Sequence, residues 1–271
     1  MKEMQKEISR EESKRIMLDI LKDISRFCDN NNIRYYLAAG TLIGAIRHKG
    51  FIPWDDDIDI EIPRPDYNRF IELYSKEGKY SVCAPLDKNS IYVYAKVYDN
   101  CTIKYELGID YSEKQPLGVD IDIFPIDGQP DEKHYKSFVR QTNMRRIIFR
   151  MFYYSIMKSK QEMAFKSKFI VAICKFISKN IFCRLYIKSA TRYSFEYSSM
   201  AGFITPYEGY DIRHRHRKDV YRDRVKVEFE NGEYWAPIGY DEYLRDVYGD
   251  YMKLPPVEQQ QTHHTNKIYW K

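Results

Sequence analysis

The 271-residue sequence has little of several features that would assign it to a class of protein at once. Its five cysteines are widely spaced and include no CxxC pair, which argues against a disulfide framework and a zinc site. No run approaches the roughly 18 apolar residues of a membrane span, and the charged N-terminus has no apolar stretch of the signal-peptide kind. We therefore expect a cytoplasmic protein with reduced thiols.

Charge is unevenly distributed along the chain. The net charge is +5, yet residues 140–192 contain 13 Lys and Arg and a single acid, Glu162. The remainder has 31 basic and 38 acidic residues, a net charge of −7. A protein that coats nucleic acid would not concentrate its positive charge in this way, and no known nucleic-acid-binding module is recognisable. The sequence thus predicts no nucleic-acid partner.

Hydrophobic spacing predicts alternating helices and strands in the first half of the chain. Residues 8–30 have helical periodicity, with Ser9 and Glu12 as a capping box. Further helices are expected at 42–47 and 63–76, and strands at 33–39, 57–62, 79–85, 91–98, 101–107 and 119–124, where Pro125 ends the run. Mostly helical residues 131–195 precede a strand at 225–229 and a helix at 240–251. This order predicts an α+β fold: a mixed sheet flanked by helices, with a basic helical insertion.

The most informative stretch is acidic, WDDDIDI at residues 54–60. Alternate side chains of a strand share a face, so Asp57 and Asp59 project together while the isoleucines enter the core. Two carboxylates so close repel each other unless a cation lies between them. Carboxylate oxygens suit hard ions, which predicts Mg²⁺ or Mn²⁺ held by Asp57 and Asp59. Asp55 is in the same register and is an alternative ligand; a solvated acidic turn is the competing interpretation.

A second pair of alternating acids, Asp120 and Asp122, lies in the strand expected at 119–124. Two such strands suggest neighbours that deliver carboxylates to one site. Gly40-Thr41, between a strand and a helix, would let the backbone approach a phosphate. Carboxylate-held metals beside a phosphate-binding turn are typical of phosphoryl or nucleotidyl transfer. Asp122 is accordingly expected to be a metal ligand and general base, with Asp120 as the alternative.

These motifs resemble those of a known family. Gly40-Thr41 followed by DIDI at 57–60 is similar to the nucleotidyltransferase-fold signature. The whole run at 37–67, LAAGTLIGAIRHKGFIPWDDDIDIEIPRPDY, resembles the defining motif of the LicD family, the bacterial relatives of fukutin-type phosphotransferases. Supporting matches are VDIDIFPIDG at 119–128 and YDEYLRDVYGDYMKLPP at 240–256.

The resemblance implies a metal-dependent phosphotransferase with a CDP-activated alcohol as donor and a glycan as acceptor. The reaction that the resemblance favours moves phosphocholine from CDP-choline to a sugar hydroxyl of teichoic acid, lipopolysaccharide or capsule, and releases CMP. Gly40 and Thr41 are expected to contact the donor phosphates, and Arg47, His48 and Lys49 to neutralise the diphosphate. The alternatives are a nucleotidyltransferase acting on a small molecule or RNA, and a non-catalytic binding module.

This interpretation divides the chain into three parts. Residues 1–130 form a nucleotidyltransferase-like catalytic core, 131–195 a basic helical subdomain, and 196–271 a C-terminal part that completes the LicD-like domain. Apolar runs beside basic residues in 140–192 suggest peripheral contact with an anionic membrane at its inner face, where a lipid-linked acceptor would be met. The alternative is an ordinary helical subdomain with solvated lysines. The run RHRHR at 213–217 is interpreted as a solvated basic loop, and His263 and His264 as tail residues that could reach the site.

Overall fold

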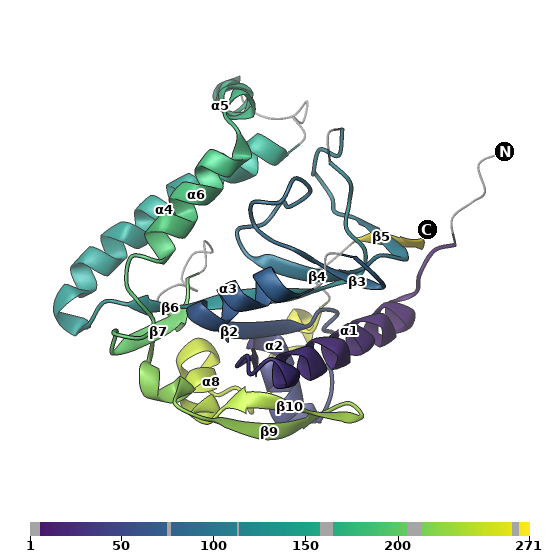
Figure 1. Cartoon of the computed structure of the whole chain (residues 1–271), viewed down its shortest axis with the longest axis vertical. Coiled ribbons are helices and arrows are strands. Elements are labelled where there is room, and N and C mark those ends of the chain that lie inside the picture. Colours follow the sequence, from purple (N-terminus) through teal and green to yellow (C-terminus); the bar gives the residue numbers. More distant parts are fainter. Residues whose placement is uncertain (1–5, 75–76, 113, 158–164, 205–212, 262–265) are drawn as a thin grey trace.

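A seven-stranded mixed sheet forms the centre of the described structure (Figure 1). The structure is a computed structural model that describes residues 6–74, 77–112, 114–157, 165–204, 213–261 and 266–271, with the side chains of 165–168 left out. The sheet order is β1-β2-β6-β4-β3, and β7 and β8 extend it beside β6. Its strands are β1 (Tyr36–Leu37), β2 (Asp59–Pro63), β3 (Tyr80–Cys83), β4 (Ala95–Asp99), β6 (Asp120–Gln129), β7 (Met200–Phe203) and β8 (His216–Arg217).

The long strand β6 joins the two halves of this sheet. On one side, residues 122–126 of β6 pair with β2, and the two strands run parallel. On the other side β4 pairs with residues 120–123 and β7 with residues 126–129, both antiparallel. Pro125 lies between these two paired segments, where a missing N–H is tolerated, so the strand continues past it to Gln129. The expectation that Pro125 ends the strand was wrong.

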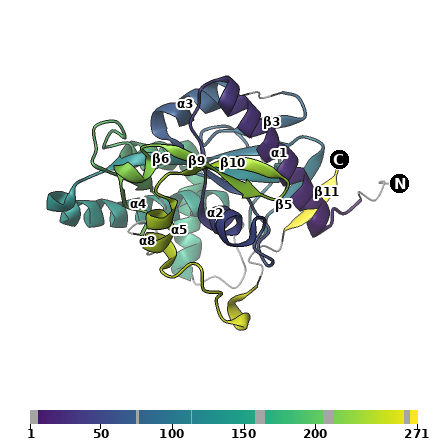
Figure 2. The same cartoon turned by 90° about the horizontal axis from the view of Figure 1, so that it is seen from below.

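Two helices pack side by side on the sheet, α1 (Arg10–Asn30) and α3 (Arg64–Leu73) (Figure 2). The expected cap of α1 is confirmed: the Ser9 hydroxyl accepts a hydrogen bond from Glu12 N–H at 3.2 Å. Phe27 of α1 contacts Phe70 and Tyr74 edge to face, with ring centroids 5.8 and 4.9 Å away. Helix α1 thus buries its apolar stripe in the main hydrophobic core.

Short elements complete the part of the fold around the sheet. The turn after β1 leads into α2 (Ala39–Ile43) and a π-helical continuation (Gly44–His48), so this helix begins three residues earlier than expected. The hairpin β9 (Arg224–Phe229) and β10 (Gly232–Pro237) precedes α8 (Tyr240–Tyr248). Strand β5 (Thr102–Tyr105) pairs with the C-terminal β11 (Lys267–Trp270). Single 3₁₀ turns lie at Glu132–His134, Lys218–Tyr221 and Val257–Gln259.

Three helices form an arm at one end of the molecule: α4 (Tyr135–Ile156), α5 (Phe165–Phe176) and α6 (Lys179–Ala190) (Figure 1). The arm has a hydrophobic cluster separate from the main core, in which Phe152, Cys183 and Tyr186 pack against Val93 and Tyr94. No helix among the described residues is long and apolar enough to span a membrane. The cysteines are all free.

The expected α+β class is confirmed, but some local expectations were wrong. Strand β2 begins at Asp59 rather than Asp57, because a turn closed by Asp55 N–H to Ile52 O (2.9 Å) precedes it. The run at 213–217 is no solvated loop: His214 and His216 are buried, since β8 pairs with β7 and α8 packs over it. His263 and His264 lie outside the described residues.

Candidate functional site

Charged side chains form a row across three adjacent strands. In the parallel pair β2–β6, Asp59 is the register partner of Asp122, and in the antiparallel pair β4–β6, Asp122 is the partner of Lys96. Register partners project from the same face of a sheet. The sheet itself therefore brings together the two predicted carboxylates and a lysine that sequence reasoning missed.

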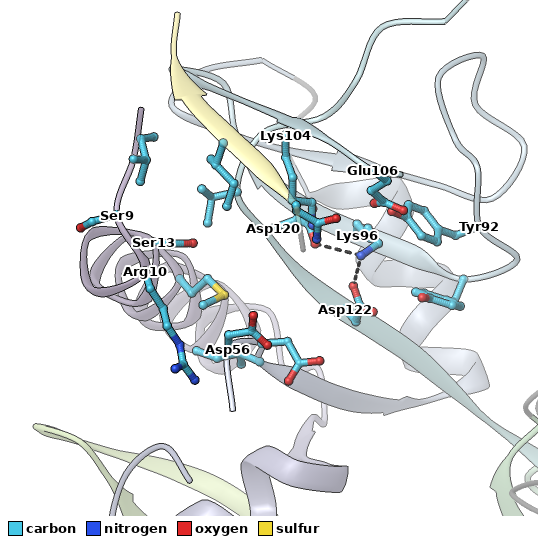
Figure 3. Close-up of a pocket in the computed structure, with 18 residues that line it drawn as sticks. Ser9, Arg10, Ser13, Asp56, Tyr92, Lys96, Lys104, Glu106, Asp120 and Asp122 are labelled. Atoms are coloured by element: carbon cyan, nitrogen blue, oxygen red, sulfur yellow. Dashed lines mark hydrogen bonds and ion pairs between the residues drawn. The ribbon is translucent and has the colours of Figure 1, made fainter. Parts of the chain in front are cut away.

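Two lysines neutralise the carboxylates of β6. Lys96 Nζ lies 2.9 Å from Asp120 Oδ1 and also pairs with Asp122, as the dashed lines in Figure 3 show. Lys104 of β5 pairs with the other oxygen of Asp120. Burial raises the pKa of Asp120, but the two lysines outweigh it and hold that pKa below its usual value. Asp120 is thus an ionised partner of lysines, whereas Asp122 faces both Lys96 and the carboxylate of Asp59.

The carboxylates of Asp55, Asp57 and Asp59, at the start of β2 and just before it, repel one another. Burial, the charge of Asp57 and a hydrogen bond to Asp57 raise the pKa of Asp55 to about 8. Burial and the charges of Asp57, Asp122 and Asp55 also raise the pKa of Asp59 well above its usual value. Such shifts mean that the cluster retains a proton unless a cation replaces it.

Helix α2 positions this cluster. Thr41 is buried, and its hydroxyl oxygen accepts a hydrogen bond from Asp59 N–H at 2.9 Å. Gly40 lies against Asp55: a Cβ on Gly40 would be 2.5 Å from Asp55 Oδ2. The Gly-Thr pair therefore fixes the backbone of Asp59 and leaves room for the Asp55 carboxylate, and its contact with a donor phosphate stays a prediction.

Lys96 and Asp122 of this row line a pocket of about 360 Å³, and Asp59 is not among its lining residues. Ser9, which caps α1, and Arg10 and Ser13 of α1 line one side, and Lys96 and Asp122 lie opposite (Figure 3). Asp57 also lines the pocket. Tyr92 lies beside Lys96, whose Nζ is 4.1 Å from the centre of the Tyr92 ring. The pocket thus combines carboxylates, buried ammonium groups and an aromatic ring.

The three basic residues expected to neutralise the donor lie elsewhere. Arg47 and His48 lie at the end of the π-helical continuation of α2, about 10 Å along the helix axis from Gly40. Arg47 Nη1 donates to Tyr251 O at 2.5 Å, and Lys49 O accepts from Glu230 N–H at 2.8 Å. None of Arg47, His48 and Lys49 lines the pocket, so their role in donor binding stays a prediction.

The carboxylate cluster can be tested as a metal site. Its donor atoms are all oxygens, and its raised pKa values show the charge that a divalent ion would balance. Among the described residues, however, no three acidic, histidine or cysteine side chains converge closely enough to hold an ion as they stand. The residue types and charges of Asp57, Asp59 and Asp122 fit Mg²⁺ or Mn²⁺, while their side chains would have to turn toward a common point.

Comparisons with known proteins show to which family the chain belongs. Residues 32–176 match the family described as LicD/FKTN/FKRP, nucleotidyltransferase domain. The chain is 32% identical to the lipopolysaccharide cholinephosphotransferase LicD of Haemophilus influenzae, over 97% of this chain and 99% of that protein. The chain belongs to the LicD family.

A more distant relative is of the same enzyme class. A shorter match of 97 residues, 32% identical, joins the chain to the ribitol 5-phosphate transferase FKRP of Homo sapiens, and covers 35% of this chain and 18% of that protein. An equal match joins it to the FKRP of Mus musculus. The expectation of a phosphotransferase is confirmed by these relatives, which disfavours a non-catalytic binding module.

A buried polar network beneath the site joins this LicD-family core to the C-terminal part of the chain. Glu61, two residues after Asp59, accepts hydrogen bonds from Tyr243 Oη (2.8 Å) and Tyr221 Oη (3.3 Å). Tyr243 Oη also accepts from Ala39 N–H at 3.3 Å, where the backbone has a φ of +45° at the start of α2. The motif at 240–256 therefore supports the turn that carries Gly40.

Some of the pocket residues that sequence analysis missed carry a signal in the sequence, and others do not. Tyr92, Tyr94 and Lys96 alternate, as residues on one face of an extended segment do, and a lysine at such an inward position is a recognisable anomaly. Arg10 and Lys104 carry no comparable signal, because each reaches the pocket through an element far from it in sequence.

Proposed function

We propose that this LicD-family enzyme transfers a phospho-alcohol from a CDP-activated donor to a hydroxyl group of a surface glycan. The observation that supports it is the row Asp59–Asp122–Lys96 across three strands, of which Asp122 and the buried ammonium of Lys96 line the pocket. A buried ammonium group beside carboxylates can stabilise the negative charge that develops on the oxygens of a diphosphate during phosphoryl transfer.

The proposed reaction is an in-line displacement at phosphorus. The glycan hydroxyl attacks the phosphorus that bears the alcohol; the new O–P bond forms as the bond to CMP breaks. Asp122 accepts the hydroxyl proton, and Lys96 stabilises charge on the phosphate oxygens. Asp57, Asp59 and Asp122 would hold Mg²⁺ or Mn²⁺, which would neutralise the donor diphosphate when bound. Thr41 keeps Asp59 in place.

Phosphocholine is the proposed cargo, as in the relative named a cholinephosphotransferase. The pocket offers a ring that already holds a positive charge, since Lys96 Nζ lies over Tyr92 at 4.1 Å. A quaternary ammonium binds aromatic faces in the same way. Tyr92→Leu should then raise the KM for CDP-choline more than the KM for CDP-ribitol; an equal rise for both donors would argue against a choline subsite at Tyr92.

A donor screen tests the proposal. Purified protein with Mg²⁺ is mixed with CDP-choline, CDP-ribitol, CDP-glycerol, CDP-ethanolamine, CTP or UTP, and thermal unfolding is followed. Stabilisation by one CDP-alcohol, with CMP as the product on addition of glycan acceptor, is the expected result. A response to nucleoside triphosphates alone, with pyrophosphate released, would instead identify a nucleotidyltransferase.

The carboxylate assignments have their own test. Asp59→Asn keeps the size of the side chain and removes its charge, so turnover should fall at least about 100-fold while the protein stays folded. The matched control is Asp19→Asn, because Asp19 is an exposed carboxylate on α1 that lies 4.0 Å from Lys79 Nζ and outside the pocket lining. Full activity of Asp59→Asn would refute its role.

A further inference from the structure

The helical arm presents an apolar surface to solvent. Phe169, Ile170, Ile173 and Phe176 lie on the exposed side of α5, and Phe176 is 92% exposed. The opposite side of the same helix is buried through Val171 and Cys174. We call these four exposed residues the α5 tip. Phe169, Ile173 and Phe176 recur at helical spacing, so the tip is one continuous stripe.

The surface continues on α6 with basic residues among the apolar ones. Ser178 caps α6 two residues after the tip ends. On the exposed side of this helix, Ile181 and Leu185 alternate with Arg184 and Lys188, while Phe182, Cys183 and Tyr186 are buried on the other side. This face of α6 is thus amphipathic in the sense of a membrane-surface helix, apolar with basic residues at its borders.

The charge of the arm favours one kind of occupant. In the described residues of 135–190 no Asp or Glu is present, and the single acid of this range, Glu162, lies outside them. A second copy of the chain would bring two positive surfaces together, which disfavours a dimer through this face. An anionic lipid surface offers both the apolar phase for the tip and negative charge for Arg184 and Lys188.

The arm is firmly joined to the wall of the pocket. Lys179 Nζ donates to Asp87 O and Ser90 O, each at 2.7 Å. Tyr94, which lines the pocket, is buried in the hydrophobic cluster with residues of α4 and α6. A surface bound through α5 and α6 would therefore be held in a fixed orientation relative to the site.

We infer that the α5 tip and the exposed face of α6 dock the protein on anionic lipid membranes, with the apolar stripe entering the interface and the basic residues contacting phosphate headgroups. This inference is independent of the donor, so failure of the donor screen would leave it standing. Its consequence for the enzyme is that an acceptor attached to lipid is met by an already oriented pocket.

Vesicle co-sedimentation tests the docking. The protein is spun with phosphatidylcholine vesicles containing about one-third phosphatidylglycerol, and with phosphatidylcholine alone, at about 0.05 M and about 0.5 M NaCl. Binding to the anionic vesicles at low salt, weakened at high salt, is expected. Absence of binding to anionic vesicles at low salt would overturn the inference.

Paired variants locate the surface. Phe169→Ser with Phe176→Ser should weaken vesicle binding at least about tenfold. Arg184→Gln with Lys188→Gln should weaken vesicle binding about 30-fold at low salt. Each basic residue near an anionic surface contributes about 1 kcal/mol of binding free energy, and the loss of two such residues corresponds to about 30-fold in affinity. The control is Leu73→Ser with Val257→Ser, two exposed apolar residues away from the arm. Equal binding by the first pair and the control would refute this surface, with thermal unfolding used to confirm that each variant is folded.

Discussion

Gly40→Ala should separate the stability of this enzyme from its activity. The new Cβ would lie 2.5 Å from Asp55 Oδ2. Ordinary van der Waals separation is about 3.5 Å, so the carboxylate must move by roughly 1 Å. Because Asp55 is the end of a flexible side chain, this movement needs no change in the backbone. Alanine is also the better helix former by about 1 kcal/mol, which offsets the contact.

We therefore expect a nearly unchanged melting temperature with a large functional loss. A misplacement of about 1 Å at a reacting group lowers turnover on the order of 100-fold, and displaced neighbours of metal ligands weaken metal affinity about 10- to 100-fold. Mn²⁺ affinity from calorimetry gives a measurement that does not depend on knowing the donor. Unchanged Mn²⁺ affinity and turnover in a folded Gly40→Ala protein would show that the Asp55 carboxylate has no part in the site.

Gly44→Ala, on the same helix, is the matched comparison. A Cβ at Gly44 would collide with the backbone oxygen of Gly50, which cannot turn away as a side chain can. This variant should lose about 1–3 kcal/mol of stability. An equal loss of stability in Gly40→Ala and Gly44→Ala would contradict the expectation that Gly40 serves activity whereas Gly44 serves stability.

Three further outcomes are expected. Asp127→Asn breaks the paired hydrogen bonds of Asp127 with Arg64, both 2.6 Å, and leaves a buried guanidinium, so urea unfolding should show a loss of about 3–5 kcal/mol. Burial lowers the pKa of His214 to about 3, below its unfolded value of about 6.5; the folded state excludes that proton, and the stability advantage of wild type over His214→Gln should shrink as pH falls from 6.5 toward 3. A difference that does not vary over this range would contradict the buried neutral imidazole. Tyr243→Phe removes the hydroxyl that bonds Glu61 and should lower stability by about 1–3 kcal/mol, measured by denaturant unfolding, while a loss below 0.5 kcal/mol would show that the hydroxyl is unimportant.

The sequence predicted local structure well where the signal is local. The capping box at Ser9 and the helical stripe of α1 involve neighbours along the chain, and the structure has both. Boundaries failed where a distant partner decides them. Strand β6 passes through Pro125 because β4 and β7 leave a break in the pairing there. The buried histidines of 213–217 were misassigned because β7 and α8, not the basic run itself, determine their burial.

The candidate site shows the same division. Alternation of acids with isoleucines predicted that Asp57, Asp59 and Asp122 lie at one site. The register of β2 and β6 places Asp59 beside Asp122, and the role of all three as site residues stays a prediction. The lysines were not predicted, since a lysine in a strand is ordinarily solvated. Lys96 is an ion-pair partner only because β4 lies antiparallel to β6 at that register.

The sequence by itself determined the family and the α+β class and singled out the acidic residues as candidates, because motifs, periodicity and caps depend on residues close together in the chain. Only the tertiary structure decided which cations face those acids, why Gly40 must lack a side chain, and which face of the arm is left to solvent. Each of these depends on contacts between segments distant in sequence. Strand register and helix packing set such contacts, and no local pattern encodes them.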